Sequence, residues 1–192
     1  MNSFKFILAT KPSTPFLKTL KTLLEIIDPI ASEKGYNTLL AKIIGLAKKQ
    51  SLQKTQGALF AKEMEQATSN YPLSEPTDWG GVPLKEVNVD KDYIRKLLVV
   101  KQYGILGFEI HKEKLEKLKV LEGICLLISS QHNKKGWQKG QVSIALGKKG
   151  DKVILQPGDE HGIIALTNCV IEEESTNHLT DLTYIFKFAQ IG

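Results

Sequence analysis

The sequence has no long apolar run, few prolines and no recognisable leader, and these shortages exclude several classes of protein. No apolar run approaches the roughly 20 residues that a membrane-spanning helix needs. The first residues, MNSFKFILATKPSTPF, hold only a very short apolar patch, which is followed by prolines and no convincing cleavage site. We therefore expect no membrane partner and no secretory signal.

Cysteine and arginine are also scarce. The two cysteines, Cys125 and Cys169, lie inside apolar runs without CxxC spacing, so we expect buried free thiols in a reducing compartment and a cytoplasmic protein. Lysine supplies nearly all of the positive charge behind the net charge of +5. No arginine-rich stretch interleaved with aromatic residues is present, so we expect no nucleic-acid partner.

What is present divides the chain into two halves with different periodicity. The 192 residues suffice for one domain with a full core, or for one domain and an appendage. Helical spacing of apolar residues predicts helices near 16–27, 37–49 and 56–67. Three prolines and a double glycine within 70–84 predict a boundary there. Residues 1–84 are thus interpreted as a helical N-terminal region and a linker.

Residues 85–192 predict a separate, mainly β domain. Short runs rich in Val, Ile and Leu alternate with glycine-containing turns, and GKKGD is typical of a hairpin tip. The runs are LKEVNVD, KLLVVKQ, YGILGFEI, VLEGICLLISS, QVSIALG, DKVILQP, HGIIALTNCVIEEE and LTYIFKFA. Eight such segments at close intervals indicate an antiparallel sandwich or barrel preceded by the α-helical region.

The stretch EIHKEKLEKLKVLEG, residues 109–123, has two interpretations. Good helix formers, a Glu113–Lys117 pair and a closing Gly123 are typical of an exposed helix. In a strand, however, Glu109 and His111 share one face, and a turn within KEKL would bring Glu116 back beside them. The β-like runs that follow favour the strand–turn–strand interpretation, which brings together three residues that can bind a metal ion.

This pattern resembles the first motif of the cupin superfamily, the small jelly-roll β-barrels. The spacing from Glu109 through His111 and Glu116 to Gly123 matches that motif, although Glu109 replaces its first histidine. The second motif is matched more loosely by Pro157-Gly158 and His161, and the resemblance covers roughly 85–190. It implies a mainly β, cupin-like antiparallel jelly-roll barrel.

A finer resemblance is to cupins of the mannose-6-phosphate isomerase type. In these proteins a residue bearing an amide or carboxyl group, two histidines and a glutamate hold a divalent metal ion. The ligands implied here are Glu109, His111, Glu116 and His161. Two imidazoles and two carboxylates suit Zn, Mn, Fe or Ni, so the donor set does not name the metal.

The function that this resemblance implies is a metal-dependent aldose–ketose isomerase of carbohydrate metabolism, acting on a small-molecule substrate such as a sugar or sugar phosphate. The metal would polarise the substrate oxygens, and a carboxylate would transfer a proton through an enediol. Glu116 and Glu172 are the candidate catalytic carboxylates. No cluster of residues that would bind a phosphate group stands out in the sequence, so this reaction stays one of several alternatives.

Two other functions remain open on the sequence. One is an Fe(II)-type cupin dioxygenase, in which open positions on the metal take substrate and oxygen. The other is a non-catalytic module that binds a metal or a small ligand, with the N-terminal helices used for a homodimer or for partner contact. A lone histidine is also commonly a core residue that binds no metal, so His111 and His161 each have a purely structural alternative. His132 and His178 are expected in exposed loops.

Overall fold

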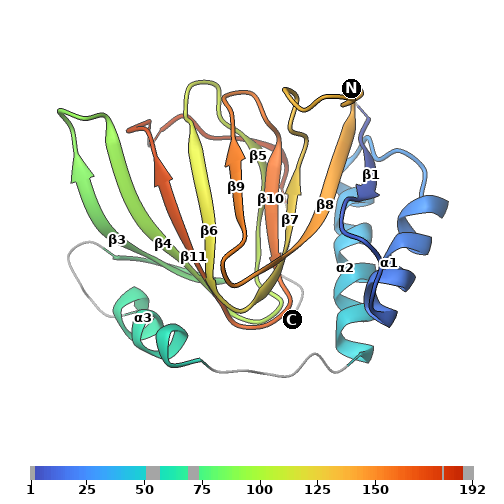
Figure 1. The fold of residues 1–192 in the computed structure, drawn as a ribbon, viewed down its shortest axis with the longest axis horizontal. Helices are drawn as coiled ribbons and strands as arrows, with labels where there is room; N and C mark the ends of the chain where they lie inside the picture. The colour runs from blue at the N-terminus through green and yellow to red at the C-terminus, as the bar shows by residue number, and fades with distance from the viewer. Residues whose placement is uncertain (1–2, 51–56, 69–73, 179, 188–192) are drawn as a thin grey trace.

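Two six-stranded sheets form most of the computed structural model, which describes residues 3–50, 57–68, 74–178 and 180–187 (Figure 1). The first sheet has the order β1 (Lys5–Leu8), β8 (Gln141–Lys148), β7 (Ile124–Ser129), β10 (His161–Ala165), β5 (Ile105–Ile110) and β12 (Thr183–Phe186). The second has the order β2 (Ser74–Thr77), β3 (Gly80–Asn88), β4 (Tyr93–Val100), β11 (Cys169–Ser175), β6 (Glu116–Glu122) and β9 (Lys152–Leu155). Neighbouring strands are antiparallel except for the parallel pair β1–β8. The protein is mainly β and forms a cupin-like jelly-roll barrel, as the sequence predicts.

The space between the two sheets holds an aliphatic core at one end and polar residues at the other. The core cluster contains Leu98, Val100, Leu118, Val120, Cys125, Leu127, Leu155, Ile163, Ala165, Cys169 and Ile171. Both cysteines are buried free thiols, as expected. Because side chains alternate between the two faces of a strand, every second residue of these strands points into the barrel. The polar end of the same strands carries the site described below.

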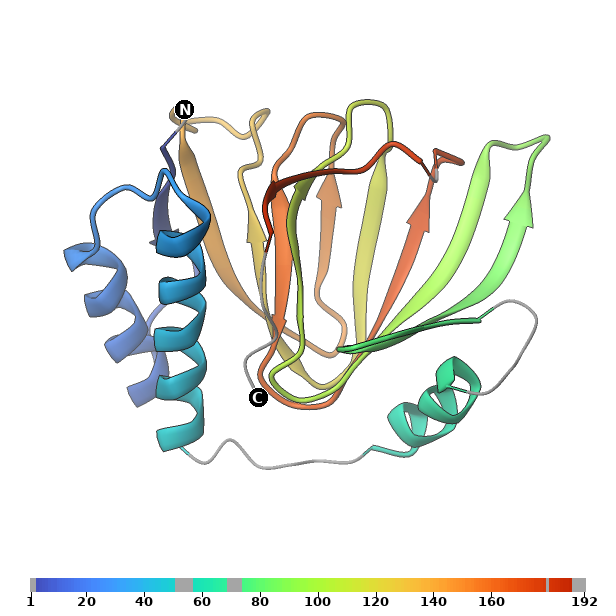
Figure 2. The same cartoon turned by 180° about the vertical axis from the view of Figure 1, so that it is seen from behind.

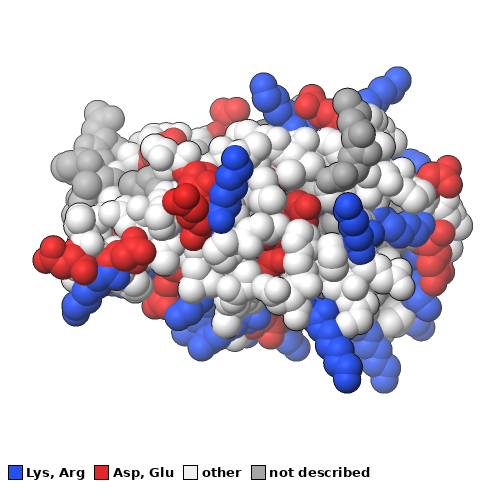
Figure 3. Space-filling model, turned by 90° about the horizontal axis from the view of Figure 1, so that it is seen from above, with Lys and Arg blue, Asp and Glu red and all other residues white. Residues whose placement is uncertain are grey.

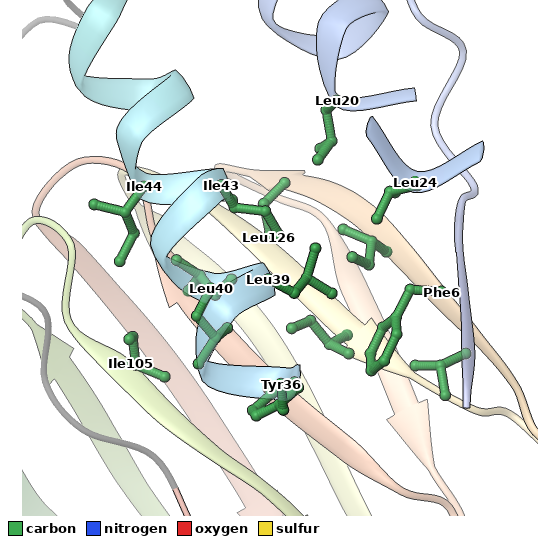
Figure 4. Packing of buried hydrophobic residues seen from close by; sticks show 14 of the residues in the cluster. Phe6, Leu20, Leu24, Tyr36, Leu39, Leu40, Ile43, Ile44, Ile105 and Leu126 are labelled. Atoms are coloured by element: carbon green, nitrogen blue, oxygen red, sulfur yellow. The ribbon is translucent and has the colours of Figure 1, made fainter. Parts of the chain in front are cut away.

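Two of the three helices cover the outer face of the first sheet, so that the sheet is buried on both sides (Figures 1 and 2). Thr14 caps α1 (Pro15–Ile26) by accepting a hydrogen bond from the backbone N–H of Leu17. Ser32 caps α2 (Glu33–Lys49) in the same way, and basic residues close its last turn. Their apolar faces pack on the sheet, where Figure 4 shows Leu39, Leu40 and Ile43 among the buried residues. None of the described helices is long and apolar enough to cross a membrane.

The third helix, α3 (Ala58–Thr68), packs on the outer face of the second sheet. Phe60 and Ala67 are buried there in a cluster with Leu97, Val99 and Val170. The carboxylate of Glu122 accepts a hydrogen bond from the backbone N–H of Phe60, at the first turn of the helix. Each of the three described helices therefore packs an apolar face on a sheet of its own chain.

The N-terminal half differs from the prediction in three places. Lys5–Leu8, inside the region expected to be helical, is a strand that extends the first sheet through β8. Residues 74–84, expected to be linker, form β2 and the first part of β3, which pair as a hairpin. The second helix begins at Glu33, not near residue 37, because Ser32 supplies a cap earlier than the apolar pattern indicates. The sheet thus begins ahead of the boundary placed at residue 84.

Two runs that the sequence presents as single strands are each broken in two. VLEGICLLISS divides at Gly123 into β6 and β7, which belong to different sheets. Gly123 has φ +88°, and a Cβ there would lie 2.2 Å from the carbonyl oxygen of Asn168. Only glycine fits a backbone of this conformation so close to its neighbour. HGIIALTNCVIEEE likewise divides into β10 and β11.

Tyr36 gives a first testable prediction. Its side chain is fully buried against Phe6, Phe108 and Phe186, and its hydroxyl has no hydrogen-bond partner among the described residues. Burial raises the pKa of this phenol, and the charge of Glu109 adds to the shift. Removing an unsatisfied buried hydroxyl is nearly neutral or stabilising. We expect Tyr36→Phe to leave the free energy of unfolding unchanged or to raise it by about 1 kcal/mol in denaturant titration.

The control is Tyr93→Phe, which removes a hydroxyl that donates to Glu174. We expect it to lower stability by at most about 0.5 kcal/mol, as is usual for partly exposed positions. A loss of more than about 1 kcal/mol in Tyr36→Phe would contradict the prediction and show that the hydroxyl is satisfied in solution.

Candidate metal centre

The stretch 109–123 folds as strand, turn and strand. Glu109 is the second-last residue of β5, Glu116 begins β6, and residues 111–115 turn between them. The carboxylate of Asp181 holds this turn, because its Oδ2 accepts hydrogen bonds from the backbone N–H groups of Glu113 and Lys114 at 2.6 and 3.2 Å. The helical interpretation is therefore wrong, and the turn brings Glu116 back to the side of His111.

Strand pairing brings His161 to the same place. In the register of β10 and β5, His161 lies opposite Glu109, and Tyr184 of β12 lies opposite Glu109 on its other side. A register irregularity between His161 and Ile163 marks this end of β10. Residues that are distant in the sequence thus become cross-strand neighbours.

All four predicted ligands converge. The ligand atoms of Glu109, His111 and His161 lie within 4.8 Å of one another. Glu109 Oε1 is 3.9 Å from His111 Nε2 and 3.7 Å from His161 Nε2. Glu116 completes the group, with Oε1 3.6 Å from His111 Nε2 and Oε2 3.0 Å from His161 Nε2. His111, Glu116 and His161 are buried and Glu109 is nearly so, which is the setting of a site and not of a solvated surface.

The hydrogen bonds of the two imidazoles test whether a metal ion fits. His111 Nδ1 lies 2.5 Å from the carbonyl oxygen of Asp181, and His161 Nδ1 lies 3.1 Å from that of Asp159. A carbonyl oxygen only accepts, so each Nδ1 carries the proton and each Nε2 of a neutral ring presents a lone pair. Both lone pairs face carboxylate oxygens, which also only accept.

Acceptor groups that face one another in this way are stabilised by a cation between them. A proton on one imidazole meets part of this need, and a divalent ion held by two imidazoles and two carboxylates meets all of it. Histidine ligands of metals are typically oriented by a carbonyl on the other ring nitrogen, as here. The residues present therefore fit a divalent metal ion, and Glu109, His111 and His161 form the closest group of candidate ligands.

The pKa shifts follow from burial and from these neighbours. Burial raises the pKa of Glu109. Burial also lowers the pKa of His111, because its effect outweighs the opposite effect of the negative charge on Glu116. Burial acts in the same sense on His161, but its hydrogen bond to Glu116 and the charges of Glu116 and Glu109 outweigh it and raise the pKa. Burial would raise the pKa of Glu116, yet His161 and Lys114 hold it well below its usual range. Glu116 is therefore an anion in the cluster.

The sequence interpretation missed a buried charge network beside the four ligands. Lys114 Nζ lies 2.5 Å from Glu116 Oε1 and 2.7 Å from Glu173 Oε1, and these three side chains are about 4% exposed. Lys96 Nζ lies 3.1 Å from the same oxygen of Glu173. The charged residues on either side of Lys114 in the sequence give no sign that it is buried. The network fixes one oxygen of Glu116 and leaves the other at the cluster.

Glu172, the second candidate catalytic carboxylate, is not brought to the site. It points to the outer face of β11, where Arg95 lies 3.6 Å away. Its neighbour Glu173 points inward and lines the cavity. The period of two along a strand decides this, because the apolar residues Cys169 and Ile171 mark the inward positions of β11. Val170, on the outer face, is apolar as well, so the sequence alone does not distinguish Glu173 from Glu172.

A cavity of about 250 Å³ opens beside the cluster. The four ligands, Lys96, Lys114 and Glu173 line one part of it, and Trp79 and Tyr184 lie on its wall. This volume lies just below the usual range of about 300–1,000 Å³ for small-molecule sites. The turn 111–115 lies at the top of the barrel in Figure 1, and Figure 3 shows acidic atoms set among uncharged ones in the middle of that face.

Gly107 keeps part of this cavity open. It lies two residues before Glu109 on the same face of β5. A Cβ at this position would lie 2.5 Å from a ring carbon of Tyr184 and 2.9 Å from Glu109 Oε2. Glycine thus allows the tyrosine ring and the carboxylate to pack closely at the edge of the site.

No family model matches the sequence, and no curated protein matches it. Among solved structures, the chain is similar to an RmlC-like cupin protein from Desulfovibrio desulfuricans, at 15% identity and a TM-score of 0.40 over 50% of this chain and 80% of that one. It is similar to KdgF from Halomonas sp., at 12% identity and a TM-score of 0.43 over 59% and 87%. It is also similar to a deletion mutant of Bacillus subtilis oxalate decarboxylase, at 15% identity and a TM-score of 0.48 over 58% and 29%. Because the identities and TM-scores are low, these structures support no conclusion about the function of the site. The site is interpreted from the side chains of this chain alone.

The raised pKa of His161 predicts how metal affinity depends on pH. A proton on His161 Nε2 occupies the lone pair that a metal ion needs, and the raised pKa keeps this proton bound to a higher pH than on a free imidazole. Titration with Zn²⁺ should therefore give an affinity that rises between pH 5.5 and 7.5, by up to about tenfold per pH unit for one displaced proton. His132→Gln should show the same dependence, since His132 lies outside the cluster and pairs with Glu160. An affinity that is constant over this range would contradict the prediction.

Proposed function

We propose that this chain is a divalent-metal-dependent enzyme that moves a proton next to a carbonyl group of a small molecule. The convergence of four acceptor side chains whose imidazole Nδ1 atoms are already bound to carbonyl oxygens supports the metal site most directly. When bound, the ion would polarise the carbonyl and hydroxyl oxygens of a substrate. Aldose–ketose isomerisation, the reaction implied by the sequence resemblance, belongs to this class.

The remaining residues of the cavity supply acid–base groups. Glu173 lines the cavity, and Lys96 and Lys114 both pair with its Oε1. A carboxylate placed on the cavity wall can accept a proton from a substrate carbon and return it to the neighbouring one. Lys114 also holds Glu116 in a fixed orientation, so the same lysine positions a metal ligand and the candidate base. In this mechanism Glu173 takes the role that the sequence interpretation gave to Glu172.

Deuterium exchange tests this function without knowledge of the natural substrate. Hydroxy-carbonyl and 2-oxo compounds, including mannose 6-phosphate, fructose 6-phosphate and 4-methyl-2-oxopentanoate, are incubated in D₂O with the Mn²⁺-loaded protein and followed by NMR. We expect deuterium to enter the carbon next to the carbonyl of at least one compound, and a chelator to stop it. Glu173→Gln should lower the exchange rate about 100-fold or more, as is typical for loss of a general base.

Glu172→Gln is the matched control, since it changes the adjacent carboxylate on the outer face of the same strand. We expect its exchange rate to stay within about twofold of the unchanged protein. Metal binding without exchange of any compound would contradict the enzymatic proposal and favour the binding module. Iron-dependent oxygen uptake would favour the dioxygenase instead.

A further inference from the structure

The wall of the cavity divides into a charged part and an aliphatic part along the same strands. Lys96 and Leu98 are two residues apart on β4, and Glu116 and Leu118 are two apart on β6. All four line the cavity, as do Leu106 and Ile163. Two residues of a strand span about 6.6 Å. The aliphatic part of the wall therefore begins about 6.6 Å from the charged part, a distance that a chain of a few carbon atoms can span.

The charged part has an excess of one positive charge once a divalent ion is bound. The carboxylates of Glu109 and Glu116 balance the two charges of the ion. Glu173 then balances only one of the two lysines, Lys96 and Lys114. Glu75 also lines the cavity from β2, but its side chain is exposed, so water weakens the effect of its charge relative to those of the buried groups. The loaded site is therefore suited to a ligand with a single negative charge.

Lys96 is the cation best placed to meet that charge. Lys114 is nearly fully buried and bridges two carboxylates, whereas the Lys96 side chain is 20% exposed and pairs among the described residues with Glu173. An ammonium group has three donors, so Lys96 can keep Glu173 and also bind a ligand oxygen. A phosphate monoester carries about −1.5 to −2 charges at pH 7, which exceeds the excess of one that the site offers.

The aliphatic part of the wall argues against a ligand that is polar along its whole length. Hydroxyl groups of a sugar placed against Leu98, Leu118 and Ile163 would lose their hydrogen bonds to water without replacement, because these side chains have no polar atoms. A hydrocarbon group placed there would instead gain by leaving water. The two parts of the wall thus call for a ligand with a charged head and an apolar body.

We propose that the substrate is a small 2-oxo or 2-hydroxy carboxylate with an aliphatic or aromatic body, whose carboxylate lies at Lys96 and the metal and whose body lies against Leu98, Leu106, Leu118 and Ile163. This inference rests on the metal-dependent function proposed above. A 2-oxo acid of this kind has a carbon next to its carbonyl from which a proton can be removed, so it suits the same chemistry.

Calorimetry on the Mn²⁺-loaded protein tests this substrate class with 4-methyl-2-oxopentanoate, pyruvate and fructose 6-phosphate as probes. We expect 4-methyl-2-oxopentanoate to bind at least about tenfold more tightly than pyruvate, because three more carbons leave water. It should also bind more tightly than fructose 6-phosphate. Lys96→Met should weaken its binding at least about tenfold, and Lys117→Met, an exposed lysine on β6, should not.

A second variant tests the contacts of the ligand's apolar body separately from those of its carboxylate. Leu106→Ala should weaken the binding of 4-methyl-2-oxopentanoate severalfold. The affinity for pyruvate should stay within about twofold, because pyruvate has no larger apolar group that contacts Leu106. Metal affinity is measured first for each variant and should stay within about twofold, as neither residue is a ligand. Metal binding with preference for fructose 6-phosphate, or with no effect of Lys96→Met, would overturn this inference alone. Failure to bind Mn²⁺ would overturn the proposed function together with it.

Discussion

Addition of Mn²⁺ or Zn²⁺ at about 100 times its dissociation constant should raise the free energy of unfolding by about 2.7 kcal/mol. A ligand that binds only the folded chain stabilises it in this way, and the four acceptors are brought together only by folding. For a chain of this size the expected rise in Tm is about 5–10 °C by calorimetry. The metal-free protein has mutually facing acceptors in this cluster, so the effect should be specific to cations that take nitrogen and oxygen ligands.

His161→Gln should abolish most of this stabilisation. His161 is the residue whose Nε2 lies closest to Glu116, and loss of one ligand of four should lower metal affinity by at least about 100-fold. His132→Gln is the matched control, because that histidine also pairs with a glutamate but lies 34% exposed outside the cluster. An equal metal-induced rise in Tm for the unchanged protein and for His161→Gln would contradict the site.

Lys114→Met should be the most destabilising single substitution in the metal-free protein. It leaves the carboxylates of Glu116 and Glu173 buried without the ammonium group that both bind. Breaking a buried ion pair from one side typically costs about 3–5 kcal/mol, which exceeds what the added apolar surface returns. Burial alone would lower the pKa of Lys114, but the charges of Glu173 and Glu116 raise it, so the lysine is charged at neutral pH. We expect a fall in Tm of about 10 °C or more.

Two further variants keep this prediction specific. Lys114→Met combined with Glu173→Gln should recover part of the loss, since one of the two stranded charges is gone. Lys117→Met, at an exposed position on the same strand as Glu116, should change stability by no more than about 0.5 kcal/mol. A Lys114→Met protein as stable as the unchanged one would show that the network does not form in solution.

The sequence could predict that Glu109, His111 and Glu116 lie close together because their spacing is a local property. Glu109 lies near the end of β5 and His111 directly after that strand, and the charged turn that His111 begins returns the chain to Glu116. His161 was found by resemblance alone, and its position opposite Glu109 depends on a pairing between strands about 50 residues apart. No local rule gives that register.

The features that were missed depend on tertiary structure. Lys5–Leu8 is only four residues long and becomes a strand through a parallel pairing with β8, more than 130 residues away. Ser74–Thr77, with the sequence SEPT, has little intrinsic preference for a strand and forms one by pairing with β3. Lys114 looks like a surface residue in its charged neighbourhood, and only the approach of Glu173 from β11 explains its burial.

The central claim is that Glu109, His111, Glu116 and His161 together hold one divalent metal ion. Anomalous diffraction from crystals of the protein grown with Mn²⁺ tests it most directly. The account predicts one strong anomalous peak per chain, about 2.0–2.3 Å from both Nε2 atoms and from oxygens of both glutamates. The absence of a peak at these four side chains, with Glu116 bound only by Lys114 and His161, would contradict the account.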